Sequence, residues 1–552
     1  MLCKPLKNET GVATLIALIM IGMLTLIGLA AMSTSDNDVT IAGNQLKEMR
    51  AFYAAEAGLE YASAQIQNVY DSTGKAPTLM PSGSETINGC SIVYETKDNG
   101  PAVTKALSIG PYAGLNSTVK SFSVQSEATG PLGEGIVSMT MTFENQLIPI
   151  FQYAVFYDGD LEMAPGPDMT LVGRIHTNGN LYIQSSNNLN IDSYVTAAGK
   201  FLRGRKGPGT VGAGKVYVKN ASGIYKSQQD NKGNWLDATV STWKSDALSR
   251  WGGKVQDGSH GQAKMNLPVA DETGNPHKII ERANGTANPD SYENKATLKI
   301  VDNIAFKQVA GSWVDVTALM VATGVITYSA DKFTDGREGK KVDVTDIDIQ
   351  KLYANGFAPS NGVIYFSDAS ASASEYPALR LKNGAELGGG LTIASENPVY
   401  TVGNFNTVNK KPASLMGDAL TFLSNSWDDS KSALAKTDRI ASSSTVNASY
   451  FTGGQTTTST EYGGGFENLP RFLEDWTGKT FTWKGSAVNL WEAQQAVGKW
   501  SNAFFSEPIR NWSYDTGLDD AANHPPEAPV VKIFRCTGWQ REHVGSDSHM
   551  YL

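Results

Sequence analysis

Apolar residues are concentrated near the N-terminus in one uncharged segment. Residues 12–32, VATLIALIMIGMLTLIGLAAM, contain no charged side chain. At a rise of about 1.5 Å per residue, a helix of this length spans about 32 Å, which matches the hydrocarbon core of a bilayer. A secretory signal has a shorter apolar region that ends in a small-residue cleavage site, and no such site precedes the polar run from Ser33. The segment predicts one membrane-spanning helix.

The charges on either side of this segment predict its orientation. Two lysines and one glutamate precede it, and the first charges after it are Asp36 and Asp38. Because positive charges favour the cytoplasmic side, we expect the N-terminus in the cytoplasm and everything after Ser33 outside.

Helical spacing continues beyond the membrane segment. No proline follows until Pro77, and Gly43 and Gly58 each weaken a helix by about 1 kcal/mol relative to Ala, so a bend could form there. Two adjacent apolar rows recur at helical intervals: Val39, Ala42, Leu46, Met49 and Tyr53, and beside them Phe52, Ala55, Leu59, Ala62, Ile66 and Val69. We expect one helix from near Val12 to near Tyr70, half in lipid and half amphipathic.

After residue 73 the pattern changes to the alternation of strands. The segments CSIVYET, KSFSVQSEA and IVSMTMTFEN are bounded by Gly, Pro and Asn turns. They predict a small sheet over residues 73–150, which could cover the apolar face of the amphipathic helix.

Very short strands between Gly and Asn turns dominate residues 151–202. Four such strands are expected at residues 160–163, 174–176, 180–183 and 189–191. Short strands with tight turns favour a parallel β-solenoid, in which each rung buries only a few side chains. The pattern resumes over residues 361–455, so we expect a discontinuous solenoid with a mixed α/β insertion at residues 203–360.

The last segment, residues 456–552, is rich in aromatic residues and is expected to cap the solenoid. A helix is expected near Glu467–Asp475, with Arg471 paired to the acidic residues around it. Six tryptophans of this segment could stack on sugars, although burial is the more common state of such residues. They are Trp476, Trp483, Trp491, Trp500, Trp512 and Trp539.

Composition limits the classes of partner. The chain has 552 residues, only 18% of them charged, with 55 glycines, which is typical of an exported β-rich protein. The net charge is −9 and no basic stripe is present, so no nucleic-acid partner is expected. Cys3 precedes the apolar segment; Cys90 and Cys536 follow it and could either form a disulfide outside the cytoplasm or stay free.

Acidic groups offer weak metal-binding signals. Asp158, Asp160 and Asp168 could hold Ca²⁺ but do not fit the EF-hand loop pattern, and short acidic turns are common without a metal. Asp346 and Asp348 alternate on a strand and are interpreted as a solvated edge. We expect no cofactor and no metal.

A polysaccharide-cleaving site is the alternative chemistry. His176 is the one histidine of six that falls in a predicted rung, and Arg174, Asp192 and Arg380 come nearest to completing an acid–base set. Stacking of Asn and His at solenoid turns explains these residues as well and is the interpretation we favour. No G-x-S-x-G, H-E-x-x-H, C-x-x-C or P-loop occurs, so we expect no enzymatic activity.

The N-terminal region carries a family resemblance. A short leader ends in Gly11, and residues 11–62 contain an AGN turn and the segment FYAAEAGLEYA. This region resembles the N-terminal part of PilX-type minor pilins of bacterial type IV pili and, more distantly, GspK-type pseudopilins of type II secretion. The segments GDALTFLSNSW, ENLPRFLEDW and PIRNWSYD are similar to the C-terminal part of large PilX-like assembly proteins, which implies no activity.

The resemblance implies a maturation step and a set of partners. A prepilin peptidase would cut after Gly11 and methylate Val12, and the helix would then leave the inner membrane to pack among other minor and major pilins. A large tip adhesin and surface glycans are further expected partners.

One departure from major pilins concerns the fifth mature position. Major pilins carry Glu there, whose carboxylate pairs with a neighbour's N-terminal ammonium, whereas this chain has Ile16. Because an unpaired buried ion costs several kcal/mol, Ile16 implies a subunit at the tip, with no subunit above it. A purely lipid-facing role for this position is the other interpretation.

The expected fold class is α+β, with a long N-terminal helix, a small pilin-like β-sheet and a large β-rich body. The expected order is a leader (1–11), the pilin helix (12–72, with 12–32 in the membrane and 33–72 amphipathic), the sheet (73–150), the two solenoid parts around the insertion, and the cap. The expected function is a minor pilin-like structural subunit, held in the inner membrane and then placed at the pilus tip on the cell surface. The alternative is an inner-membrane-anchored β-helix protein that binds or cleaves polysaccharide.

Overall fold

The computed structural model describes residues 10–73, 75–108, 112–133, 136–207, 209–267, 275–285, 288, 290–372 and 374–542. Most of the predicted leader, including Cys3, lies outside the described residues. The chain forms two compact units. The first, here called the N-terminal unit, comprises Met1–Ala102, Val119–Asn145 and Ile533–Leu552, and the second, here called the body, comprises Val103–Thr118 and Gln146–Lys532.

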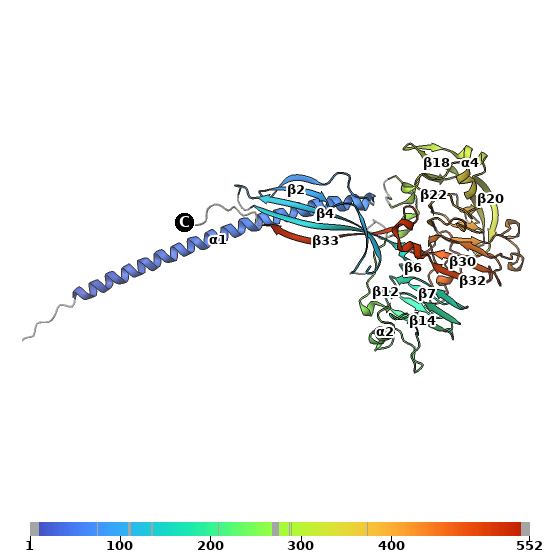
Figure 1. Ribbon diagram of the computed structural model, residues 1–552, viewed down its shortest axis with the longest axis horizontal. Coiled ribbons are helices and arrows are strands. Elements are labelled where there is room, and N and C mark those ends of the chain that lie inside the picture. The colour runs from blue at the N-terminus through green and yellow to red at the C-terminus, as the bar shows by residue number, and fades with distance from the viewer. Residues whose placement is uncertain are drawn as a thin grey trace, which may run out of the picture. The chain divides into compact units, whose positions relative to one another are not determined.

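The N-terminal unit is built on one long helix, α1 (Thr10–Thr73; Figure 1). The predicted helix from near Val12 to near Tyr70 is confirmed, and neither Gly43 nor Gly58 interrupts it. By length and composition it is the one helix among the described residues that could cross a membrane. The first predicted apolar row is exposed, whereas one face is buried from residue 51 onward, through Ala51, Ala54, Ala55, Leu59, Ala62, Ile66 and Tyr70.

The buried face of α1 packs on a six-stranded sheet, in which β2 and β4 run alongside the helix (Figure 1). The strand order is β1 (Ser82–Ile87), β2 (Cys90–Asp98), β4 (Asn116–Thr129), β5 (Val137–Pro149) and β33 (Val530–Glu542), with β3 (Val103–Ala106) paired to β4. The three predicted strands are confirmed as β2, β4 and β5. The edge strand β33, from near the end of the chain, was not expected in this sheet.

Helix and sheet approach most closely at Gly58. A Cβ atom added there would lie 2.3 Å from Ser126 Oγ and 2.8 Å from Ile92 Cγ2. Glycine therefore permits a contact between α1 and the sheet that no other residue allows without a shift.

The disulfide between Cys90 and Cys536 is not formed, so that option was wrong. Both cysteines are free, Cys90 buried on β2 and Cys536 exposed on β33. Two strands, β4 and β5, lie between them. Three strand spacings alone separate the two residues by at least about 14 Å, about twice the Cα separation that a disulfide spans.

The body is β-rich with mixed sheets, and its first part has a regular step of 20 residues along the chain. In one sheet β7 (Leu161–Met163), β10 (Leu181–Ile183) and β13 (Phe201–Arg203) pair in parallel, with Leu161, Leu181 and Phe201 in register. A second sheet contains β8 (Met169–Leu171), β11 (Asn188–Ile191), β14 (Lys215–Lys219) and β15 (Tyr225–Ser227). The predicted short strands are confirmed as β7, β9, β10 and β11.

A twelve-stranded sheet joins distant parts of the chain. Its order is β16 (Val255–Gln256), β12 (Val195–Ala197), β9 (Arg174–Thr177), β6 (Tyr153–Tyr157), β31 (Ala487–Asn489), β29 (Ser449–Thr452), β26 (Ala413–Gly417), β24 (Leu391–Ser395), β22 (Val363–Ser367), β17 (Leu298–Val301), β18 (Ile304–Val309) and β19 (Ser312–Asp315). Neighbours pair in parallel from β16 to β17. The chain enters in the middle at β6, runs to β16, resumes at the other side with β17 and returns to β31, beside β6.

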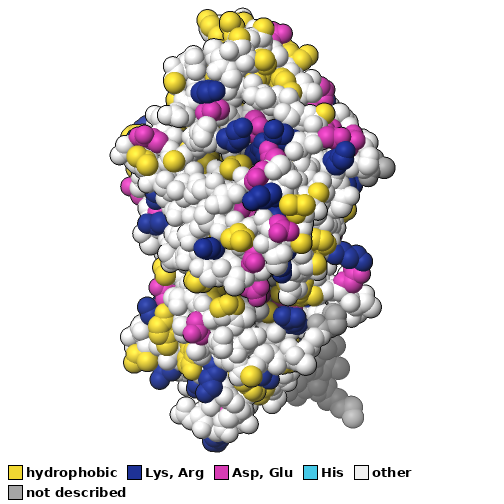
Figure 2. Space-filling view, turned by 90° about the vertical axis from the view of Figure 1, so that its right-hand side faces the viewer, with side chains coloured by type: hydrophobic (Ala, Val, Ile, Leu, Met, Phe, Trp, Pro, Cys, Tyr) yellow, Lys and Arg dark blue, Asp and Glu magenta, His cyan; other side chains and the backbone are white. Residues whose placement is uncertain are grey.

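Two further sheets and four short helices complete the body. One sheet has the order β20 (Ile326–Asp335), β21 (Lys340–Asp348), β23 (Glu375–Lys382), β25 (Val399–Val402) and β27 (Leu420–Leu423), and the other β28 (Ser444–Val446), β30 (Thr480–Gly485) and β32 (Ile509–Tyr514). The helices are α2 (Trp243–Trp251), α3 (Tyr292–Lys295), α4 (Thr317–Ala322) and α5 (Ile349–Ala354). On the face of the body in Figure 2, positive and negative side chains are interspersed.

The predicted boundaries within the body differ from the pairing that the structure shows. Residues 203–360, expected as an insertion, contribute β14, β16, β17 and β21, which pair in parallel with strands outside that range. The predicted helix near Glu467–Asp475 is wrong: only Phe466–Asn468 forms a single 3₁₀ turn. Pro470 lacks the amide that a continuing helix needs. Arg471 instead pairs with Glu338, at 2.7 Å between Nη1 and Oε1.

Candidate functional site

The apolar start of α1 is the first feature with functional meaning. Gly11, Val12 and Ile16 all lie on α1 and are exposed, Ile16 to 52%. No described residue covers the large apolar side chains from Val12 to Met32. A continuous apolar surface of this kind requires lipid or other protein as its surroundings.

The residues considered as an alternative for polysaccharide cleavage lie in or directly after strands of three different sheets. Arg174 and His176 lie on β9, Asp192 follows β11, and Arg380 lies on β23 in another sheet. His176 is fully buried, with Nδ1 2.8 Å from the hydroxyl of Thr196 and its other ring nitrogen bonded to an amide oxygen. Burial lowers the pKa of His176 to about 4. The ring is therefore a neutral, satisfied core residue at pH 7.

The acidic turns considered for calcium connect segments that lie 20 residues apart in the chain. Each aspartate accepts a hydrogen bond from the asparagine 20 residues later. The pairs are Asp158 with Asn178 at 2.9 Å, Asp160 with Asn180 at 2.7 Å and Asp168 with Asn188 at 2.9 Å. These carboxylates hold neighbouring turns together, which gives them a structural use without a metal.

The predicted solvated edge at Asp346 and Asp348 is wrong, because β21 is paired on both sides and both residues are buried. Arg380 donates to the two carboxylate oxygens of Asp346 at 2.7 and 3.0 Å. Asp348 accepts from the backbone of Lys351 and so caps α5. The hydrogen bonds to Asp346 and Asp429 favour the charged guanidinium and raise the pKa of Arg380, although burial opposes them.

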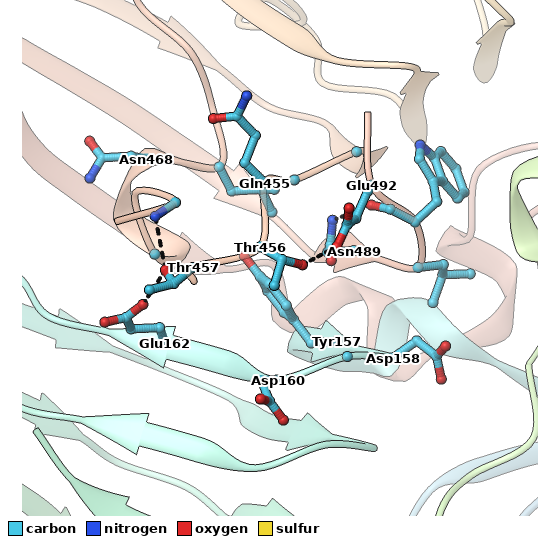
Figure 3. A pocket seen from close by; sticks show the side chains of 18 of the residues that line it. Tyr157, Asp158, Asp160, Glu162, Gln455, Thr456, Thr457, Asn468, Asn489 and Glu492 are labelled. Atoms are coloured by element: carbon cyan, nitrogen blue, oxygen red, sulfur yellow. Dashed lines mark hydrogen bonds between the residues drawn. The ribbon is translucent and has the colours of Figure 1, made fainter. Parts of the chain in front are cut away.

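A polar cleft lies in the body where the two distant parts of the twelve-stranded sheet meet (Figure 3). Its volume is about 220 Å³. Tyr157, the last residue of β6, is in register with Asn489 of β31, and both line it. The remaining walls come from the turn after β6, the loop at residues 453–469, and residues 490–492.

Several carboxylates line the cleft. Glu162 accepts a hydrogen bond from Thr457 Oγ1 at 2.6 Å, and Thr456 donates to Glu492 (Figure 3). Burial raises the pKa of Glu162 above its ordinary value, although the hydroxyl of Thr457 opposes this. Asp160 pairs with Lys206 at 2.9 Å.

Two buried arginines also line the cleft. Arg471 is paired with Glu338, whereas Arg337, only 8% exposed, donates to two uncharged acceptors. These are the carbonyl of Gly498 at 2.9 Å and Gln455 Oε1 at 3.2 Å. Within the described part of the chain, no carboxylate lies within 4.0 Å of the Arg337 guanidinium. Burial, together with the charge of Arg471, lowers the pKa of Arg337 to about 9.

Sequence analysis singled out only part of this cleft, and for other reasons. Asp158 and Asp160 were considered for calcium, Arg471 for a helix and Trp491 for sugar stacking. Arg337 was missed because it reaches the cleft from the turn between β20 and β21, far from the other lining residues in sequence. The glycines at both ends of residues 453–465 were a local sign of the loop that lines the cleft.

No family model and no curated protein matches the sequence. Among solved structures, the chain is similar to the competence-associated pilin ComZ from Thermus thermophilus. The identity is 11%, the TM-score is 0.29, and the alignment covers 90% of this chain and 98% of that chain. A TM-score this low assigns no function. The structure itself shows a long N-terminal apolar helix and a large β-rich body of mixed sheets.

Proposed function

We propose that the chain is a minor pilin-like structural subunit of a type IV pilus or a related secretion pseudopilus, acting without catalysis. The observation that supports this proposal is the division of α1 into two halves. The first half is apolar and exposed on all sides, and the second buries one face on the sheet of its own unit. A lone membrane anchor does not need the second half, whereas a subunit that exchanges lipid for neighbouring helices needs a rigid extension.

Maturation of the helix would follow the resemblance. A prepilin peptidase would cut after Gly11 and methylate Val12, leaving the whole apolar segment on the mature protein. Before assembly the chain would sit in the inner membrane with its N-terminus in the cytoplasm. Other pilins would then replace the lipid around residues 12–32.

Two features support a position at or near the filament tip. Ile16 offers no carboxylate to the N-terminal ammonium of another subunit, so a further subunit above it would bury an unpaired charge. The body also holds most of the chain, and so much lateral mass is difficult to repeat along a close-packed shaft. A large tip adhesin would be a suitable neighbour.

We also propose that the body is a discontinuous parallel β-solenoid. The 20-residue steps of β7, β10 and β13 and the parallel pairing from β16 to β17 support this arrangement. In such a structure the junction of β6 with β31 would unite the two solenoid parts into one body.

Mass analysis of the mature N-terminus, together with immunogold labelling of sheared filaments, tests the proposal. We expect native protein that begins with methylated Val12 and label at filament ends. Gly11→Ala should block processing and keep the chain in the cell envelope. Gly22→Ala is the matched control, because an added Cβ at Gly22 in the same helix meets nothing within 4 Å. Native protein that still begins at Met1 and never enters filaments would refute the pilin assignment, and label along the whole shaft would refute the tip position.

The polar cleft favours a second function, glycan binding by a membrane-anchored body that never enters a filament. Under this alternative, Gly11→Ala would leave glycan binding and piliation unchanged.

A further inference from the structure

Arg337 is buried in the cleft without a charged partner. Its two nearest acidic neighbours are engaged elsewhere: Asp335 accepts from Tyr400 at 2.6 Å, and Glu338 accepts from Arg471. Burying a guanidinium with only neutral acceptors costs free energy, and folded proteins normally pair such a charge. Groups kept at such a cost are concentrated at functional sites. Arg337 therefore indicates an anion that is supplied from outside the chain.

The rest of the cleft limits which anion fits. Four carboxylates line the same space, Asp158, Asp160, Glu162 and Glu492, and only Asp160 is paired with a lysine, so a compact dianion such as phosphate would meet repulsion there. A single carboxylate carries half that charge and matches the planar guanidinium. A carboxylate is therefore the anionic group that best fits beside the Arg337 guanidinium.

Several polar groups in the cleft retain acceptor capacity. Asp158 accepts a hydrogen bond from Asn178 at Oδ1, and Glu492 accepts one from Thr456 at Oε1. Asn468 donates from Nδ2 to the carbonyl of Gly464. Asp158 Oδ2, Glu492 Oε2 and Asn468 Oδ1 accept no hydrogen bond from the described residues. Hydroxyl groups are the ligand chemistry that such oxygens recognise. In Figure 3, Asn468 and Asp158 lie on opposite sides of the cleft, with Gln455 and Glu492 between them.

We propose that this cleft binds an acidic oligosaccharide, with the carboxylate of one ring at Arg337 and the hydroxyls of this ring and its neighbours on the oxygens of Asp158, Asn468 and Glu492. The volume of about 220 Å³ is suited to one sugar ring, so the other rings would lie along the open side of the cleft. A neutral sugar would leave Arg337 unpaired, and a simple carboxylic acid would leave the hydroxyl-accepting groups unused. The inference does not depend on assembly into a filament.

The test is calorimetric titration of the full-length protein in detergent micelles. The probes are D-glucuronate and D-galacturonate oligosaccharides, compared with the corresponding neutral oligosaccharides, acetate and inorganic phosphate. We expect at least one uronate series to bind about tenfold or more tightly than its neutral counterpart, since a charge-assisted pair at a buried site is worth about that much. Equal affinity for uronate and neutral sugar, no uronate binding at all, or phosphate or acetate binding as tightly as uronate would overturn the proposal.

Variants separate ligand binding from folding. Arg337→Gln should weaken uronate binding about tenfold or more, and without ligand its Tm should equal or exceed that of the wild type, because the unpaired charge is gone. Arg203→Gln is the matched control, because Arg203 stacks on Trp235 at 3.6 Å and does not line the cleft. Asn468→Ala tests the hydroxyl contacts without touching the buried charges and should also weaken uronate binding. Wild-type affinity in both Arg337→Gln and Asn468→Ala would refute the assignment.

Discussion

Substitution of Gly58 by alanine should loosen the N-terminal unit, although alanine is the better helix former. In an exposed helix the change from Gly to Ala stabilises by about 1 kcal/mol. At Gly58 the new methyl group would lie 2.3 Å from Ser126 Oγ and 2.8 Å from Ile92 Cγ2. Both distances are far inside van der Waals contact, so either the side chains of Ser126 and Ile92 must leave their packed positions or helix and sheet must move apart.

The magnitude follows from the two opposing effects. Overpacking of a tight core costs about 1–3 kcal/mol, and at Gly58 the added atom meets side chains of both β2 and β4. We therefore expect Gly58→Ala to destabilise the unit by about 1–2 kcal/mol net. Gly43→Ala, in the same helix but with nothing within 4 Å of the new Cβ, should stabilise by up to about 1 kcal/mol.

Hydrogen–deuterium exchange with mass spectrometry can measure this in the full-length protein, because peptides from β2 and β4 report on the N-terminal unit alone. Gly58→Ala should speed exchange in these strands, and Gly43→Ala should leave it unchanged or slow it. The double variant Gly58→Ala/Ser126→Ala removes the shortest contact and should recover part of the loss. Equal exchange in the two single variants would refute the close-packing argument.

Four further predictions concern charge and assembly. Ile16→Glu should let the subunit enter the filament shaft and change pilus number, as counted by electron microscopy; unchanged incorporation would remove the main support for the tip position. Asp346→Ala should destabilise the body by about 1–3 kcal/mol, because buried Arg380 loses both of its hydrogen bonds to Asp346 and keeps only the pair with Asp429, as measured by chemical denaturation; unchanged stability would contradict this. Burial raises the pKa of Glu474 from 4.5 to about 7, so between these pH values the folded state keeps a proton that the unfolded state loses. The wild type should therefore lose about 3 kcal/mol of stability as the pH rises from 4.5 to 7, and Glu474→Gln should not show this loss. His176 has the opposite sign: its pKa of about 4 predicts a loss of about 3 kcal/mol as the pH falls from 6.5 to 4, absent in His176→Gln, and parallel pH profiles would contradict it.

Local patterns predicted the parts of the fold that local physics determines. The continuous helical spacing through Gly43 gave α1 nearly to its ends, because apolar periodicity and the lack of proline act over neighbouring residues. The triplets around Leu161, Leu181 and Leu189 likewise gave their strands, since turns of Gly and Asn bound each one.

Features that depend on contacts between distant segments could not be predicted in this way. Asp346 alternates like an edge residue, and only the placement of Arg380 on the adjacent strand shows that it is buried and paired. Arg337 is likewise unremarkable in sequence, and its burial in the cleft depends on the meeting of β6 and β31. Burial and charge pairing at these positions are properties of the assembled sheets.

The connection of the body to the rest of the chain explains how the packing of α1 on its sheet and the cleft of the body coexist in one protein. The larger of the body's two segments, Gln146–Lys532, begins near the end of β5 (Val137–Pro149) and ends near the start of β33 (Val530–Glu542), and these two strands are neighbours in one sheet. At the crossing point the amide of Ile150 donates to the carbonyl of Pro529 at 3.3 Å, so entry and exit lie side by side. A segment inserted between two such close points adds little to the entropy cost of the host fold, since that cost grows only with the logarithm of loop length. The helix and its sheet can therefore keep the close packing around Gly58, while the inserted body carries a cleft of its own.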